Sequence, residues 1–167
     1  MRLTAAPYGQ GTLYFNLDAP YKDEKFILET DARDIDLTIF NPMIIPMTGL
    51  EIESGIIERL NLVMDASRFT ARNDFLFNYS GLKVNLLVES RKEEFNNLGF
   101  LSAIANSAVS PQNLPGNPGY TGEKAFVTDR NILRSPFNLM WMSIKDGLTL
   151  IVPSDAASLF IKKKKRN

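Results

Sequence analysis

The first half of the chain alternates between apolar and polar residues with a period of two. Two stretches, residues 11–17 and 25–32, collect their apolar side chains on one face, which carries Leu13, Phe15, Leu17, Phe26 and Leu28. Because successive side chains of a strand point to opposite faces of a sheet, the pattern predicts two strands, each with one apolar face. Residues 18–23 between them have the composition of a turn.

The same alternation is clearest between residues 50 and 89. It predicts strands over 50–65, 70–79 and 82–89, with Ser80 and Gly81 forming a tight hairpin turn between the last two. Neighbouring antiparallel strands with this pattern present one apolar face. We expect that face to be formed by Leu60, Leu62, Met64, Phe75, Phe77, Tyr79, Leu82, Val84 and Leu86.

Other segments have a different texture. Residues 39–46 contain two prolines, too many for a central strand, and predict a short helical or irregular plug. Apolar residues at helical spacing predict a helix within 95–108, and three prolines and three glycines predict an exposed loop over 111–123. A last strand is expected at 125–130.

Two helices are predicted near the C-terminus. Ser135 followed by Pro136 is a typical helix start, with an N-cap residue and a proline at the first helical position. The apolar stripe expected on this helix is Phe137, Met140, Trp141, Ile144 and Leu148. A final helix is expected over 154–165.

These elements predict a mainly β fold with C-terminal helices. The expected architecture is a curved antiparallel sheet of about six strands, shaped as a β-groove. We expect residues 1–90 to form the sheet, and residues 91–167 to supply a helix, a Pro/Gly loop and terminal helices that close the same domain.

The composition removes most kinds of catalytic site. The 167 residues include no cysteine and no histidine. Without them the chain has no disulfide, no thiolate nucleophile, no zinc–sulfur site and no Ser-His pair. Asp31, Asp34 and Asp36 lack calcium-loop spacing, so we interpret them as a solvated face. We therefore expect no enzymatic activity, no metal and no cofactor.

Charge is balanced overall but not locally. Nineteen basic residues match nineteen acidic ones, which argues against nucleic acid as a partner. Near the C-terminus five cations are consecutive: Lys162, Lys163, Lys164, Lys165 and Arg166. Such a run is either a solvated tail or a contact for anionic lipid head groups or nucleic acid. The first residues, MRLTAAP, lack the apolar core of an export signal, and no apolar run of about 18 residues occurs, so we expect this sequence itself neither to direct export nor to cross a membrane.

The aromatic face has two interpretations. It is either an ordinary hydrophobic core or a groove that holds acyl chains. Few elements are available to cover the sheet, and its other face stays polar, which favours a groove. The groove candidates are Leu13, Phe15, Phe26, Leu60, Leu62, Met64, Phe75, Phe77, Tyr79, Leu82, Val84 and Leu86.

Several segments occur in an informative order. Residues 36–42 read DLTIFNP, residues 49–55 read GLEIESG and residues 78–87 read NYSGLKVNLL. A helical segment, a Pro/Asn loop and the RSPFNLMW segment at 134–141 follow. In this order and spacing the chain resembles the C-terminal region of AsmA-like proteins of the bacterial envelope, over residues 30 to 150.

The resemblance implies a β-groove that carries phospholipids between membranes without chemistry, in the periplasm or cell envelope. The chain lacks the family's N-terminal membrane helix and is much shorter, so we expect a terminal module of a longer anchored protein. Its partners would be a phospholipid or other acyl-chain ligand and a membrane surface or envelope protein. The alternative is a standalone structural or protein-interaction domain whose apolar face is an ordinary core.

Overall fold

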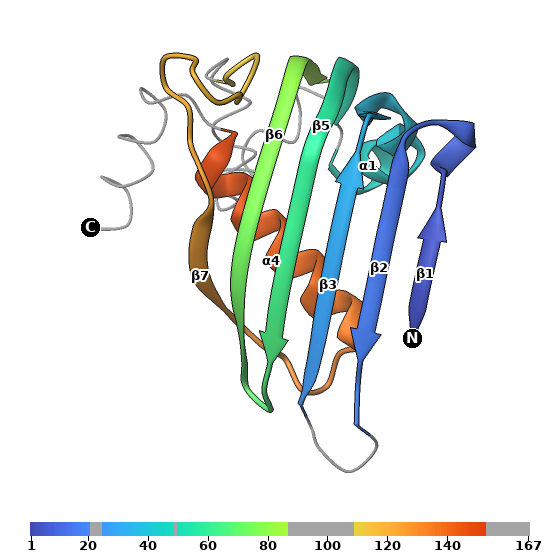
Figure 1. Cartoon of the computed structure of the whole chain (residues 1–167), viewed down its shortest axis with the longest axis vertical. Helices are drawn as coiled ribbons and strands as arrows, with labels where there is room; N and C mark the ends of the chain where they lie inside the picture. Colours follow the sequence, from blue (N-terminus) through green and yellow to red (C-terminus); the bar gives the residue numbers. More distant parts are fainter. Residues whose placement is uncertain (21–24, 49, 87–108, 153–167) are drawn as a thin grey trace. The chain divides into compact units, whose positions relative to one another are not determined.

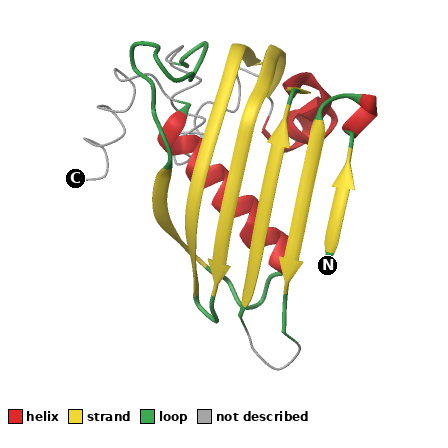
Figure 2. Cartoon of the chain, in the orientation of Figure 1, coloured by secondary structure: helices red, strands yellow, loops and turns green. Residues whose placement is uncertain are grey.

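The computed structural model describes residues 1–20, 25–48, 50–86 and 109–152. It contains an open antiparallel sheet in the order β1-β2-β3-β5-β6-β7, with β4 pairing with β5 (Figures 1 and 2). The prediction of a mainly β fold with a C-terminal helix is confirmed. The strands are β1 (Arg2–Ala5), β2 (Thr12–Asp18), β3 (Phe26–Arg33), β4 (Ile35–Asp36), β5 (Leu50–Ala66), β6 (Thr70–Leu86) and β7 (Lys124–Asp129).

Short helical elements connect the strands. They are the 3-10 turns η1 (Pro7–Gly9) and η2 (Leu37–Phe40), followed directly by helix α1 (Asn41–Thr48). The predicted plug is therefore helical. The predicted C-terminal helix is α4 (Pro136–Ile151), which begins at the expected proline. The helices predicted within 95–108 and 154–165 lie outside the described residues.

The chain divides into two compact units, each made of three separate segments. The first contains residues 1–35, 57–78 and 122–148, and the second contains residues 36–56, 79–121 and 149–167. Strands β5 and β6 and helix α4 each pass from one unit to the other.

In the first unit, strand register places one set of side chains on a common face. Leu17 lies opposite Leu28, and Leu28 lies opposite Met64 on the next strand. Directly opposed residues of antiparallel strands share a face. The rows Leu3–Phe15–Thr30–Leu62 and Ala5–Leu13–Ala32–Leu60 therefore point the same way as Leu17, Leu28 and Met64.

Helix α4 packs on this face of the first unit (Figure 1). The Ser143 hydroxyl donates to the Met64 sulfur at 3.5 Å, and Gly147 lies against the ring of Phe75. Along α4 the buried residues are Leu139, Ser143, Gly147 and Ile151, at four-residue spacing.

The predicted apolar stripe of this helix is wrong. Phe137 is exposed, and Met140, Trp141, Ile144 and Leu148 are only half-buried. Two small residues, Ser143 and Gly147, occupy the buried side of the helix because they let its backbone approach the sheet closely. Larger side chains then lie beside the contact.

In the second unit, the predicted hairpin turn at Ser80–Gly81 is also wrong. Strand β6 continues through both residues. Gly81 has φ +62°, a conformation typical of a bulge, and its carbonyl accepts a hydrogen bond of 2.8 Å from the Ser54 hydroxyl. Strand β5 is as long as β6 and lies next to it in the sheet, so β6 continues instead of reversing.

Asparagine side chains join other parts of the second unit by imitating a backbone. The Asn41 amide donates to the Ile52 carbonyl at 2.9 Å and accepts from the Ile52 N–H at 2.8 Å. Asn113 makes the equivalent pair with Thr121, at 2.9 and 2.7 Å, and its backbone bridges to Tyr79. Asn113 is buried, so the predicted exposed loop is anchored at this residue.

Candidate functional site

Some of the predicted groove residues are buried and others are only half-buried. In the first unit Phe26, Leu62, Met64, Phe75 and Phe77 are buried. Helix α4 covers Met64 and Phe75 directly, and the rings of Phe75 and Phe77 stack with centroids 6.3 Å apart. At these positions the chain's own side chains fill the space that a groove would need, so this group forms a core.

Burial decreases towards β2 and β1 along the two rows that contain Met64 and Leu62. Met64 and Leu28 are buried, whereas Leu17 on the same row is half-buried. On the next row Leu62 is buried, Phe15 is half-buried and Leu3 is exposed. We use the name open apolar face for Leu3, Leu13, Phe15 and Leu17.

The open apolar face carries no charge. The α4 side of strands β1, β2 and β3 presents only Leu3, Ala5, Leu13, Phe15, Leu17, Phe26, Leu28, Thr30 and Ala32. A surface of this kind has little to offer a charged ligand and favours hydrocarbon, since burying apolar area is its main source of binding free energy.

Sequence reasoning named Leu13 and Phe15 as groove residues but not Leu17 or Leu3. Leu17 continues the same alternation and could have been found from it. Leu3 belongs to β1, a strand that the sequence analysis missed because four residues are too few to establish a period. Leu60, which was named, is half-buried.

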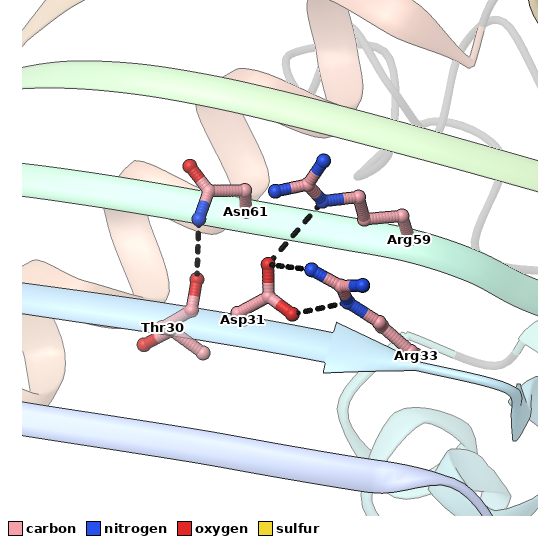
Figure 3. Close-up of polar contacts among 5 residues, drawn as sticks. All are labelled: Thr30, Asp31, Arg33, Arg59 and Asn61. Carbon is pink, nitrogen blue, oxygen red and sulfur yellow. Dashed lines mark hydrogen bonds and ion pairs between the residues drawn. The ribbon is translucent and has the colours of Figure 1, made fainter.

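The opposite face of the first unit is polar and carries an ionic cluster on β3 and β5 (Figure 3). Asp31 accepts from Arg33 Nε at 2.7 Å and from Arg59 Nε at 3.3 Å. The hydrogen bond from Arg33 is the main cause that holds the pKa of Asp31 below its usual value. The Arg33 and Arg59 side chains are 53% and 46% exposed, so solvent screens the cluster and it contributes little to stability.

The other two acids of the predicted cluster have local roles. Asp36 caps η2 by accepting from the Thr38 N–H at 2.8 Å, which lowers the pKa of Asp36. It is half-buried and is the last residue of strand β4. Asp34 has φ +54° in the tight turn after β3. Among the described residues, no three acidic side chains are grouped so that they could hold a metal ion.

A buried polar chain joins β6, β7 and α4 in the first unit. Asn73 Nδ2 donates to Thr128 Oγ1 at 3.2 Å, and the Thr128 hydroxyl donates to Asp146 Oδ2 at 2.9 Å. A hydroxyl next to a carboxylate is a possible nucleophile and base pair. However, Asn73 and Thr128 are both buried, so no substrate can reach the hydroxyl. These hydrogen-bonded side chains therefore have a structural role.

The remaining groove candidates belong to the second unit. Tyr79 and Leu82 are buried and Val84 is half-buried. The Tyr79 hydroxyl donates to the Ser110 carbonyl at 3.0 Å, and burial raises the pKa of Tyr79 to about 12. The side chain of Leu86 and the predicted membrane contact of Lys162–Lys165 and Arg166 lie outside the described residues.

Within the described ranges no helix is both long and apolar enough to cross a membrane. The chain matches no protein-family model, no curated protein and no solved structure.

Proposed function

We propose that the chain is a non-enzymatic module that binds acyl chains on the open apolar face, as part of phospholipid transport or outer-membrane assembly in a bacterial envelope. The observation that supports this is the loss of burial along uncharged rows of one sheet face, from Leu62 to Phe15 and Leu3. The resemblance to AsmA-like envelope proteins supplies the transport context.

The proposed site is smaller than the groove expected from the sequence. It leaves out Met64, Phe75 and Phe77, because these side chains form the core beneath α4. The free energy of binding would still come from burying the hydrocarbon of the ligand. Each methylene of a ligand that is removed from water contributes about 0.8 kcal/mol, and this term does not weaken when salt is added.

A second function is favoured by the coverage of the central strands. Because α4 closes the face over Met64 and Phe75, the sheet also fits a structural or protein-interaction domain with an ordinary core. In that case the open apolar face would pack against another protein and would hold no lipid. The two functions differ in whether lipid accompanies the purified chain.

The test is native mass spectrometry for co-purified phospholipid, with Phe15→Asp as the disrupting variant. Tyr14→Asp is the matched control, since Tyr14 is an equally half-buried aromatic residue on the other face of the same strand. We expect bound lipid in the wild type and in Tyr14→Asp, and its loss from a folded Phe15→Asp. A wild-type chain that carries no lipid and takes up no fluorescent fatty acid would refute the acyl-chain proposal.

A further inference from the structure

Two neighbouring turns in the first unit present large apolar side chains to solvent. One is the turn from β5 to β6, where Phe69 is 61% exposed. The other follows β7, where Ile132 is 54% and Leu133 is 89% exposed. The Arg130 N–H donates to the Phe69 carbonyl at 2.7 Å, so the second turn starts beside the first. We name Phe69, Ile132 and Leu133 the apolar tip.

Both turns are well-formed and hold their apolar residues outward. Ser67 and Thr70 close the first turn through a backbone hydrogen bond of 2.8 Å. In the second turn the Arg134 N–H donates to the Asn131 carbonyl and the Leu133 N–H donates to the Asn131 side chain, both at 3.0 Å. Ile132 and Leu133 thus occupy the two central positions of this turn.

Central turn positions normally carry Gly, Asn, Asp or Ser, because these residues suit both the backbone and water. Two large aliphatic residues there expose most of their hydrocarbon to water. Phe137, in the first turn of α4, adds a fourth large side chain that is 68% exposed. Such a cluster indicates an interaction surface.

The charges around the tip indicate the kind of partner. Residues 66–70 and 130–137 include Arg68, Arg130 and Arg134 and no acidic residue. Arg68 and Arg134 are exposed, and the Arg68 guanidinium lies over the Phe69 ring, 5.3 Å from its centroid. The nearest acids along the chain are Asp65, the second-last residue of β5, and Asp129, the last residue of β7, and both are exposed.

We infer that the apolar tip docks on an anionic membrane surface, with Ile132, Leu133 and Phe69 entering the interface and Arg134 meeting lipid head groups. Apolar residues on protruding turns can reach into a bilayer, and flanking cations are attracted to its charged surface. This site uses none of the residues of the open apolar face. It also differs from the basic run near the C-terminus.

The membrane test is co-sedimentation of the full chain with phosphatidylcholine vesicles, with and without phosphatidylglycerol. We expect binding only to the anionic vesicles. The double change Ile132→Ser with Leu133→Ser should weaken the partition constant at least about tenfold. Arg134→Gln should weaken it about fivefold at low salt and less at high salt.

Tyr8→Ser is the matched control. Tyr8 is 82% exposed and precedes β2, whereas the tip lies at the other end of the strands, where Asp18, Ile27 and Asp65 are opposed. Its removal should leave vesicle binding unchanged. A version ending at Ile161 separates the tip from the basic run, since the tip changes should still weaken whatever binding this version retains.

A direct readout of insertion uses the single tryptophan of the chain. In a Trp141→Phe background, the tryptophan introduced by Leu133→Trp is the only one in the chain. On anionic vesicles its fluorescence emission should shift to the blue, and brominated lipid should quench this fluorescence. Equal vesicle binding by wild type and the double serine variant, or an unquenched Leu133→Trp, would overturn the inference. A double serine variant that loses self-association instead of vesicle binding would make the tip a protein interface.

The same samples distinguish this inference from the acyl-chain proposal. Bound phospholipid measured by native mass spectrometry should persist in the double serine variant, because the open apolar face is intact. Loss of vesicle binding with retained lipid supports the tip. Retained vesicle binding in Phe15→Asp shows that docking does not depend on the acyl-chain site.

Discussion

Gly147 of α4 lies so close to the ring of Phe75 that a Cβ added to it would be 2.3 Å from Phe75 Cδ1 and 2.7 Å from Cγ. Phe75 cannot easily move away. Its ring is fully buried, stacks on Phe77 and meets the edge of Phe126 at a centroid distance of 6.5 Å. The absence of a side chain at Gly147 therefore decides how near the helix comes to the sheet.

We predict that Gly147→Ala destabilises the protein even though alanine is the better helix former. The helix propensity gain is about 1 kcal/mol, whereas overpacking a filled core costs about 1–3 kcal/mol and here displaces an aromatic ring. Urea unfolding should show a net loss of up to about 2 kcal/mol. Asn138→Ala, at an exposed position of the same helix, should be neutral or slightly stabilising. A more stable Gly147→Ala would contradict the close approach.

Gly11→Ala should be far more damaging than Gly81→Ala. Both glycines have positive φ, +57° and +62°, which costs an alanine about 1 kcal/mol. Only at Gly11 would the Cβ also collide with backbone, at 2.2 Å from the Arg33 carbonyl oxygen. We expect losses of about 3 kcal/mol or more at Gly11 and about 1 kcal/mol at Gly81. Similar losses in thermal or urea unfolding would show that crowding at Gly11 is not decisive.

Thr128→Val tests the buried polar chain. Valine has nearly the same shape but deprives Asp146 of a donor and Asn73 of an acceptor in a buried place. Leaving such groups without partners costs about 1–3 kcal/mol, which urea unfolding should detect. Thr12→Val, at an exposed position of β2, is the control and should change stability by less than about 0.5 kcal/mol.

Tyr79 should make the protein sensitive to alkali. Its pKa is raised from 10.0 to about 12 by burial, so the folded state holds the proton more tightly than the unfolded state. The resulting stability is complete below pH 10 and is lost as the pH rises towards 12. At pH 8 Tyr79→Phe should be about 1 kcal/mol less stable than wild type, because it loses the hydrogen bond to Ser110.

Between pH 10 and 12 the wild type should approach and then fall below the stability of Tyr79→Phe, which has no proton to lose at this position. Urea unfolding of the two proteins at pH 8 and pH 11 measures the difference. A constant difference at both pH values would mean that Tyr79 is not protonated more tightly in the folded state.

The open apolar face could be predicted only in part from the sequence. Phe15 and Phe75 occupy equivalent positions in an alternating pattern, and nothing local separates them. The side chain of Phe15 on β2 is only half-buried. The ring of Phe75 lies directly against Gly147 of α4. Which apolar residues are core and which are surface depends on where the helix crosses the sheet.

The sequence shows the apolar residues of the apolar tip, but it does not show that they form an exposed cluster. Ile132 and Leu133 follow Asn131 in a segment that reads as an irregular connection before Ser135 and Pro136. A sequence does not show that these side chains face water. The hydrogen bond from Arg130 to the Phe69 carbonyl, across 61 positions of the chain, is what brings the two turns together.

The local sequence pattern determined where most strands and the C-terminal helix lie. Tertiary packing determined which of their side chains are buried and where strand β6 ends. Period-two alternation was sufficient for β2, β3 and β5, and Ser135–Pro136 was sufficient for the start of α4, because strand and cap preferences act within a few residues. The course of β6 through Gly81 depended on its long partner β5. The buried line Leu139–Ser143–Gly147 depended on the surface that α4 meets. Both are settled by residues distant in the chain, and close packing selects the small side chain wherever two backbones must approach.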